Sequence, residues 1–234
     1  MIFKGWGQNL ERNSALKGKF ITFEGSEGCG KSTQSRKLCQ YLKNNGYSVV
    51  YLREPGTTVI SEKIREILLD PKNLIAPSCE MLLYMASRSQ VVNEVIKPAL
   101  SKGKIVICDR FFDSTVAYQG FGLGMDVDFI KILGKFVCDG IKPDLTLLLD
   151  LSVKKGLGYR KDSQDRIEKR PYAYHVRVRK GYLNLATLEP ERIKIVKVAE
   201  DKAVTQEKIR KIVIDFIKPG KCISVVSRQL IADS

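Results

Sequence analysis

Eight residues near the N-terminal end constrain the fold more than any other part of the chain. Residues 25–32 have the sequence GSEGCGKS and match the pattern GxxxxGK[ST] at every fixed position. An apolar run, 19–24 (KFITFE), stands directly before them, and a stretch with helical periodicity, 31–44, follows. A strand, a glycine-rich turn and a helix in this order are the arrangement that wraps phosphate groups. We therefore expect an α/β fold with a polyphosphate site at the end of its first strand.

The residue types of this loop suit a bound triphosphate. Glycines let backbone amides approach phosphate closely, Lys31 can reach the β and γ phosphates, and Ser32 can face Mg²⁺. Glu27 needs a different partner, because a carboxylate beside a triphosphate is repulsive. A sugar hydroxyl of a second substrate is one candidate, and a solvent-facing position is the alternative. The predicted ATP-binding residues are Gly25, Ser26, Glu27, Gly28, Cys29, Gly30, Lys31, Ser32 and Thr33.

Short apolar runs alternate with longer amphipathic stretches along the rest of the chain. The predicted strands are 19–24, 48–53, 104–108, 145–151 and 193–198. The predicted helices are 31–44, 59–70, 79–101, 126–139, 172–187 and 205–218. This alternation predicts repeated βα units, whose right-handed crossovers cover both faces of one parallel sheet with helices.

Length and composition favour one domain. The 234 residues are 44% hydrophobic and 28% charged, which is typical of a globular chain. We predict a single domain over 18–219, extensions at 1–17 and 220–234, and a flap over about 154–170, where charge and glycine are concentrated. Six cysteines without a CxxC pair, and His175 as the single histidine, give poor support for a zinc site and favour structural roles.

The formal net charge of +14 is the unusual bulk property. It fits a nucleic-acid or acidic membrane surface, a substrate with several phosphates, or simply a basic solvated surface. The first twenty residues lack the unbroken apolar stretch of a secretory signal, and no apolar run is long enough to span a bilayer. A cytoplasmic location is therefore the default expectation.

Polar residues follow the second and third predicted strands, where open α/β sheets bind ligands. Residues 53–56 (REPG) end the second strand, and Asp109 and Arg110 end the third. Asp109 suits Mg²⁺, held directly or through water together with Ser32, and Arg110 suits a transferring phosphate. The chain lacks the guanine-reading NKxD segment of GTPases. A small kinase with a second site for a phosphate acceptor remains.

Six ordered blocks resemble the thymidylate kinase family and together cover about 19–218. They are FEGSEGCGKSTQ (23–34), REPGTT (53–58), LLYMASRSQ (82–90), DRFFDSTVAYQG (109–120), DRIE (165–168) and RVRKGYLNLA (177–186). The resemblance implies transfer of the γ-phosphoryl group of ATP to dTMP, with Mg²⁺, in a homodimer. It also implies the three-layer P-loop nucleoside monophosphate kinase fold, with a five-stranded parallel sheet of order 2-3-1-4-5.

The resemblance also implies three groups of acceptor contacts. Around the base they are Tyr84, which would stack on thymine, and Arg88, Thr115 and Gln119. Around the sugar they are Tyr118 at the 2′ position and Glu27 at the 3′ hydroxyl. Around the phosphate they are Arg53, Arg65 and Arg110. Each has a simpler alternative, a core position for Tyr84 and a surface ion pair for Arg65.

The acceptor phosphate is mostly dianionic at neutral pH, because its second pKa is about 6, so the reaction needs no general base. The predicted catalytic residues are Lys31, Asp109, Arg110 and two basic residues of the flap, Arg160 and Arg166. The phosphate loop contributes no further basic residue, so the chain resembles the bacterial subclass that carries this charge in the flap. Lys161 is less suited, because an ammonium group cannot make a forked contact.

Thr57 departs from the family pattern, which has a second glycine in REPGGT. Two other functions stay open on the residues alone. One is a kinase of the same fold with another nucleoside or nucleoside monophosphate as acceptor. The other is a basic nucleic-acid-binding protein with a vestigial nucleotide site, whose binding would fall steeply with salt.

Overall fold

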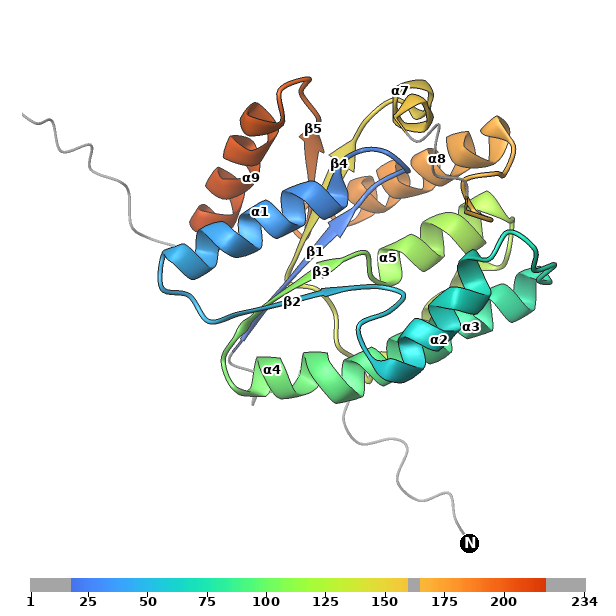
Figure 1. Cartoon of the computed structure of the whole chain (residues 1–234), viewed down its shortest axis with the longest axis horizontal. Coiled ribbons are helices and arrows are strands. Elements are labelled where there is room, and N and C mark those ends of the chain that lie inside the picture. Colours follow the sequence, from blue (N-terminus) through green and yellow to red (C-terminus); the bar gives the residue numbers. More distant parts are fainter. Residues whose placement is uncertain (1–17, 160–164, 218–234) are drawn as a thin grey trace, which may run out of the picture.

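One parallel sheet organises the computed structural model, which describes residues 18–159 and 165–217 (Figure 1). Its strands are β1 Lys19–Glu24, β2 Val49–Arg53, β3 Ile105–Asp109, β4 Leu145–Asp150 and β5 Ile193–Lys197. They pair in the order β2-β3-β1-β4-β5, and every pair is parallel. The predicted strands agree with these to within one residue at each end, and the predicted strand order is confirmed.

Helical segments connect the strands. In chain order they are α1 Lys31–Asn44, α2 Val59–Leu69, α3 Pro77–Val91, the π-helical η1 Val92–Ile96, α4 Lys97–Ser101, α5 Phe112–Thr115, the π-helical η2 Val116–Gly122, α6 Val127–Val137, α7 Val153–Gly158, α8 Tyr172–Leu188 and α9 Lys202–Ile217. Among the described residues, no helix is long and apolar enough to cross a membrane.

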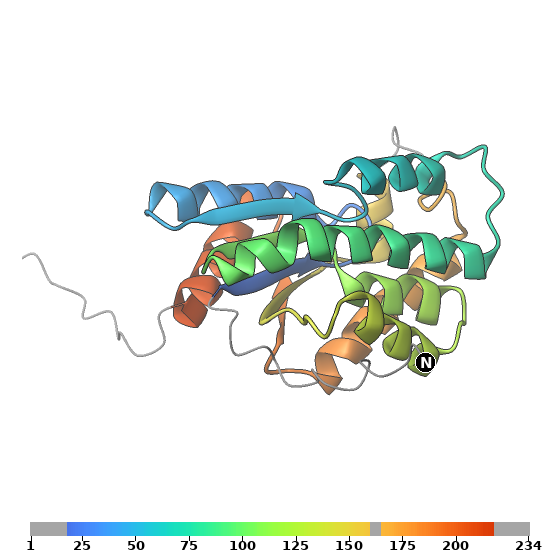
Figure 2. The same cartoon turned by 90° about the horizontal axis from the view of Figure 1, so that it is seen from below.

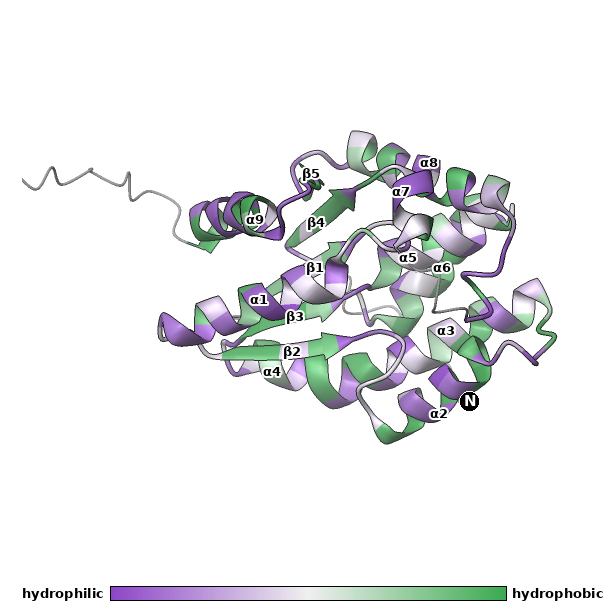
Figure 3. Ribbon diagram, turned by 45° about the horizontal axis from the view of Figure 1, so that its top comes forward, coloured by the Kyte–Doolittle hydropathy of each residue, from purple (hydrophilic) through white to green (hydrophobic). Residues whose placement is uncertain are grey.

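The sheet buries apolar side chains on both faces. Phe20 and Ile21 are neighbours in β1 and point to opposite sides, so they join different clusters. On the Ile21 side, α1 and α9 cover the sheet with residues such as Leu38 and Ile209, both fully buried. On the Phe20 side, the segments from α3 to α4, η2 and α8 do the same. Figure 3 shows the hydrophobic strands enclosed between these helical layers.

The predicted helix over 79–101 is three consecutive segments that form one rod (Figure 2). Pro98 explains the π-helical turn before it. Proline has no N–H to donate, so the regular bond to the carbonyl group four residues earlier is lost. The backbone instead widens over η1, where the N–H group of Lys97 bonds to the carbonyl oxygen of Val92, five residues back.

Two helical segments were not predicted. The segment α5–η2 is buried over most of its length, from Thr115 to Gly120 without interruption, so it shows no alternation of polar and apolar faces. The helix α7 lies within the predicted flap and contains two glycines, Gly156 and Gly158, which hide its helical pattern. The two predicted extensions, 1–17 and 220–234, lie outside the described residues.

Candidate functional site

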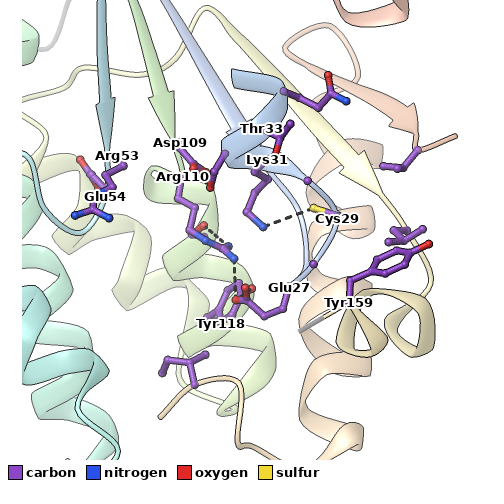
Figure 4. Close-up of a pocket in the computed structure, with 18 of the residues that line it drawn as sticks. Glu27, Cys29, Lys31, Thr33, Arg53, Glu54, Asp109, Arg110, Tyr118 and Tyr159 are labelled. Carbon is purple, nitrogen blue, oxygen red and sulfur yellow. Dashed lines mark hydrogen bonds and ion pairs between the residues drawn. The ribbon is translucent and has the colours of Figure 1, made fainter. Parts of the chain in front are cut away.

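The phosphate loop, residues 25–32, joins the end of β1 to the start of α1. Gly30 precedes α1 with a φ of 90°, a left-handed conformation that favours glycine. The side chain of Lys31 folds back over the loop, where its Nζ donates to the carbonyl oxygen of Ser26 at 2.8 Å and to Cys29 Sγ at 3.6 Å (Figure 4). The loop thus brings backbone amides, the positive end of a helix and one ammonium group into the same small space.

The phosphate loop also packs directly against α7. A Cβ atom added at Gly28 would lie 1.9 Å from the carbonyl oxygen of Gly156, and one added at Gly156 would lie 2.3 Å from that of Glu27. Because both contacts are with backbone atoms, neither residue tolerates a side chain without moving one of the two segments. The first helix of the predicted flap is therefore in backbone contact with the loop.

Asp109 ends β3 beside the phosphate loop. In the sheet it pairs with Phe23 of β1 on one side and Arg53 of β2 on the other. Its Oδ2 accepts a hydrogen bond from the hydroxyl group of Ser32. A carboxylate and a hydroxyl group in contact offer the oxygen ligands that Mg²⁺ prefers, and a nucleotide would supply the others. The described residues contain no cluster of three or more His, Cys, Asp or Glu that could hold a metal by themselves.

Arg110 follows Asp109 with a φ of 72°, which turns its side chain away from the strand direction and toward the loop. One guanidinium nitrogen lies 2.7 Å from Glu27 Oε1, which also accepts from the Tyr118 hydroxyl group at 2.7 Å. The other terminal nitrogen donates to the carbonyl oxygen of Gly25 and to the hydroxyl group of Tyr182, both at 3.2 Å. Arg110 therefore bridges the phosphate loop and α8.

Glu24 lies beneath this arginine and is fully buried. Its oxygens accept from the backbone N–H of Phe111 at 2.7 Å and from the hydroxyl groups of Ser114 at 2.6 Å and Tyr182 at 2.9 Å. Burial, together with the nearby charge of Asp113, raises the pKa of Glu24 to about 7. A carboxyl group that titrates near neutrality thus supports the backbone and hydroxyl groups around Arg110.

Arg88 lies at the centre of the acceptor side, by which we mean the part of the site that holds the predicted base and phosphate contacts. It is 2% exposed. Its Nε donates to Glu54 Oε2 at 2.8 Å, and its terminal nitrogens donate to Thr115 Oγ1 at 2.8 Å and to the carbonyl oxygen of Phe111 at 3.1 Å. Burial raises the pKa of Glu54, and the attraction of Arg88 opposes that rise. Removing one member of such a buried pair leaves the other uncompensated and costs about 3–5 kcal/mol.

Two more predicted arginines lie at the rim of this region. Arg53 pairs with Glu62 at 3.2 Å, and both side chains are about two-fifths exposed. Arg65 donates to the carbonyl oxygen of Pro55 at 2.8 Å. Between them Thr57 has a φ of 83°, a conformation that disfavours β-branched residues. Thr57 therefore keeps the backbone conformation that favours glycine, although its side chain is β-branched.

A cavity of about 670 Å³ joins the phosphate loop to the acceptor side. The predicted residues that line it are Glu27, Gly28, Cys29, Gly30, Lys31, Ser32, Thr33, Arg53, Arg65, Tyr84, Arg88, Asp109, Arg110, Thr115, Tyr118 and Gln119. Gly25 and Ser26, at the start of the loop, are not part of this lining. His175 is 1% exposed in α8, where burial lowers its pKa, and it is not part of the lining.

Arg166 lies away from the phosphate loop. Its Nε donates to the carbonyl oxygen of Leu68 at 2.9 Å, and a terminal nitrogen lies 2.5 Å from Glu80 Oε2. These contacts tie the end of the predicted flap to α2 and α3. Arg160 and Lys161, the other basic candidates of the flap, lie outside the described residues.

Several contact residues were missed by sequence reasoning: Glu24, Glu54, Glu80, Ser114, Arg170 and Tyr182. A signal existed for Glu24, because a charged residue that closes an apolar strand just before a phosphate loop is unusual. Glu54 stands inside the REPGTT block. Ser114 and Tyr182 likewise stand inside the quoted blocks 109–120 and 177–186. Glu80 contacts Gln119 and Arg170, which lie 39 and 90 residues away in sequence, and no local pattern reveals such contacts.

The chain matches the family model described as Thymidylate kinase over residues 23–209. A thymidylate kinase of Caldanaerobacter subterraneus subsp. tengcongensis is 44% identical over 207 residues, which is 88% of this chain and all of that one. A thymidylate kinase of Halothermothrix orenii is 51% identical over 176 residues, 73% of this chain and 85% of that one.

A solved structure agrees with these sequence relatives. The crystal structure of thymidylate kinase from Ehrlichia chaffeensis superposes with a TM-score of 0.70 at 35% identity, and the match covers 84% of this chain and 98% of that one. The chain therefore belongs to the thymidylate kinase family.

Proposed function

We propose that the protein transfers the γ-phosphoryl group of ATP to dTMP and releases dTDP and ADP. The observation that carries this proposal is the single cavity that holds the phosphate loop at one end and the buried Arg88–Glu54 pair at the other. Arg110 lies between the two ends and contacts Glu27 of the loop. A donor triphosphate and an acceptor monophosphate placed in this cavity would meet at Arg110.

The residues present fit a magnesium ion. Ser32 and Asp109, at the start of α1 and the end of β3, would hold it directly or through water. When bound with ATP, the ion would neutralise charge on the phosphates. Lys31 would bind the β and γ phosphates, and the phosphate loop together with Thr33 would supply backbone donors.

Acceptor binding would use the contacts implied by the family. Tyr84 would stack on thymine, and Arg88, Thr115 and Gln119 would contact its edge. Tyr118 would crowd the 2′ position of the sugar, and Glu27 would accept from the 3′ hydroxyl group. The hydrogen bond that Tyr118 donates to Glu27 supports the proposal that the two residues act together on one sugar.

Catalysis in this proposal consists of positioning and charge compensation. The acceptor phosphate is already a nucleophile at neutral pH, so the protein must bring two anions together. Lys31 and Arg110 would compensate their charge, with Arg53 and Arg65 at the rim and Arg160 as the basic residue of the flap. Arg166 pairs with Glu80 in this structure and would have to leave that carboxylate before it could contact a phosphate. This contact weakens the support for Arg166 as the basic residue of the flap.

We further propose that residues 18–219 act as one cytoplasmic domain that forms a homodimer. The helix α6 exposes Phe129, Ile132 and Phe136, at 54%, 70% and 58%, on one apolar stripe. A second copy would cover this stripe.

The test is ADP release from Mg·ATP with dTMP, dUMP, dCMP, dGMP, AMP and thymidine as separate acceptors and with water as the control. Turnover dominated by dTMP is the expected result. Preference for another acceptor would contradict the proposed substrate and keep the phosphotransfer chemistry. No turnover with any acceptor, combined with salt-sensitive binding of DNA or RNA, would favour a nucleic-acid-binding function.

A further inference from the structure

Glu80 is a fully buried carboxylate on α3, one helical turn before Tyr84 and two before Arg88. Its Oε1 accepts from Gln119 Nε2 at 2.9 Å. Its Oε2 lies 2.5 Å from a guanidinium nitrogen of Arg166 and 2.6 Å from one of Arg170. Gln119 is one of the proposed base contacts, whereas Glu80 is not among the lining residues of the cavity.

The chemistry of this contact fixes the orientation of the Gln119 amide. A carboxylate that compensates two guanidinium groups has only acceptor oxygens, so the amide must turn its NH₂ group toward Glu80. The two ends of an amide point in different directions. The carbonyl oxygen of Gln119 is therefore the end that remains for the cavity, which Gln119 lines.

A carbonyl oxygen in that place recognises a hydrogen-bond donor. Thymine and uracil carry an N–H group at ring position 3, whereas cytosine carries a bare acceptor nitrogen there. A cytosine base would bring two acceptors together and leave both without a partner in a buried site, which is a strong basis for rejection. A Gln119 amide that was free to rotate could donate to cytosine and would lose this discrimination.

We propose that Glu80 is a specificity-determining positioning residue, which fixes the Gln119 amide so that the site accepts a pyrimidine with a donor at position 3 and rejects one with an acceptor. This inference rests on the proposed function and adds the origin of its base selectivity. Arg166 and Arg170 hold the carboxylate in place and compensate its buried charge, with side chains 12% and 16% exposed.

The test is the substitution Glu80→Gln, which preserves shape but offers Gln119 either a donor or an acceptor. The measured quantity is the ratio of kcat/KM for dTMP to that for dCMP. We expect this ratio to fall roughly tenfold or more, because the amide of Gln119 can now turn. The ratio of dTMP to dUMP should stay within about twofold, because both bases present the same donor.

Matched controls separate orientation from general loosening of the site. Glu94→Gln, on the exposed surface of η1, should leave every ratio unchanged. In a Gln119→Leu background, where no amide remains to be oriented, Glu80→Gln should no longer change the ratio of dTMP to dCMP. Arg170→Gln keeps the carboxylate, so it should change stability or kcat more than the base ratio.

The outcomes distinguish the inference from the proposed function. If the wild-type protein does not phosphorylate dTMP, the proposed function fails. If it does, and Glu80→Gln lowers kcat/KM for dTMP and dCMP by the same factor, the positioning role is wrong and Glu80 is only structural. Should Glu80→Gln fail to fold, calorimetric binding of dTMP and dCMP to Glu80→Asp, whose shorter side chain withdraws the acceptor oxygen from Gln119, replaces it. An unchanged preference between the two nucleotides there would overturn the inference.

Discussion

The donor side and the acceptor side of the cavity are built in different ways. The donor side is built mainly on one continuous segment, residues 25–33, in which Lys31 contacts Ser26, while α7 and Asp109 meet this segment from farther along the chain. The acceptor side joins β2, α3, the segment after β3, and residues 165–182. Its contacts join residues far apart, such as Glu54 with Arg88 and Glu24 with Tyr182.

This difference predicts different responses to substitution. A change in the donor loop removes a contact to substrate and leaves the rest of the sheet intact. A change on the acceptor side also removes a contact between elements of the fold, because the same side chains that face the cavity hold α3, η2 and α8 together. Donor-side variants should therefore lose activity without losing stability, whereas acceptor-side variants should lose both.

The largest effect is expected for Lys31→Ala. It removes the ammonium group proposed to bind the β and γ phosphates, so kcat/KM for ATP should fall on the order of 10³- to 10⁴-fold. The thermal unfolding midpoint and the calorimetric affinity for dTMP should change little. Lys37→Ala, exposed on the same helix, is the control. Equal loss of dTMP affinity would show that the two sides are not separable.

The next largest effect is expected for Arg110→Ala, at the junction of the two sides. Loss of the guanidinium group should lower kcat on the order of 10²- to 10³-fold while the protein stays folded. Steady-state kinetics measures kcat, and circular dichroism checks the fold. Arg110→Lys should recover little, because one ammonium nitrogen does not reproduce the two separate guanidinium nitrogens, of which one contacts Glu27 and the other contacts Gly25 and Tyr182. Turnover like that of the wild type in either variant would contradict the proposed role.

The same comparison explains what the sequence could predict. The five strands, their order and the phosphate loop follow from patterns over five to fifteen residues, where local propensity and the final structure agree. Residues 53–56, Arg110 and Glu27 were predicted from their places at the ends of strands and in the phosphate loop, whereas the base contacts were predicted only through the family resemblance. Their supporting partners were not, because a carboxylate such as Glu80 meets Arg170 only after α3 and α8 pack against the same core.

Arg166 shows where the resemblance itself stops. The sequence places a basic residue in the flap but does not say which anion it contacts. In this structure a protein carboxylate, Glu80, provides the contact that the sequence interpretation assigned to a transferring phosphate. A carboxylate and a phosphate can each compensate the charge of a guanidinium group, so the sequence does not distinguish the two partners. Only the folded chain determines which of them lies near Arg166.

The pH dependence of the free energy of unfolding tests how Glu24, which is buried beneath Arg110, contributes to stability. The pKa of Glu24 is raised from 4.5 to about 7 by burial and by Asp113. A raised carboxyl pKa stabilises the folded state most at low pH, and this contribution is lost as pH rises from about 4.5 to about 7. The free energy of unfolding of the wild type, minus that of Glu24→Gln, should therefore fall by about 3 kcal/mol over this window.

Urea unfolding of both proteins between pH 4 and 8 measures this difference, and other titrating groups cancel because the two proteins share them. Glu66→Gln, exposed on α2, supplies a control whose difference from the wild type should stay nearly constant. A difference for Glu24→Gln that is flat across the window, or that rises with pH, would contradict a raised pKa of Glu24 in the folded protein.

The smallest effect is expected at Thr57, in the loop after β2, where the backbone conformation suits glycine. Its φ of 83° strains a β-branched residue by about 1–2 kcal/mol. Its hydroxyl group offsets this by accepting from the Arg53 N–H at 3.1 Å and donating to the Arg53 carbonyl oxygen at 3.0 Å. Thr57→Ala keeps the strain and loses both bonds, whereas Thr57→Gly loses the bonds and the strain. The glycine variant should therefore be more stable than the alanine variant by about 1 kcal/mol in urea unfolding. Equal stabilities would mean that the loop rearranges in one of the variants, and KM for dTMP would then differ between the two.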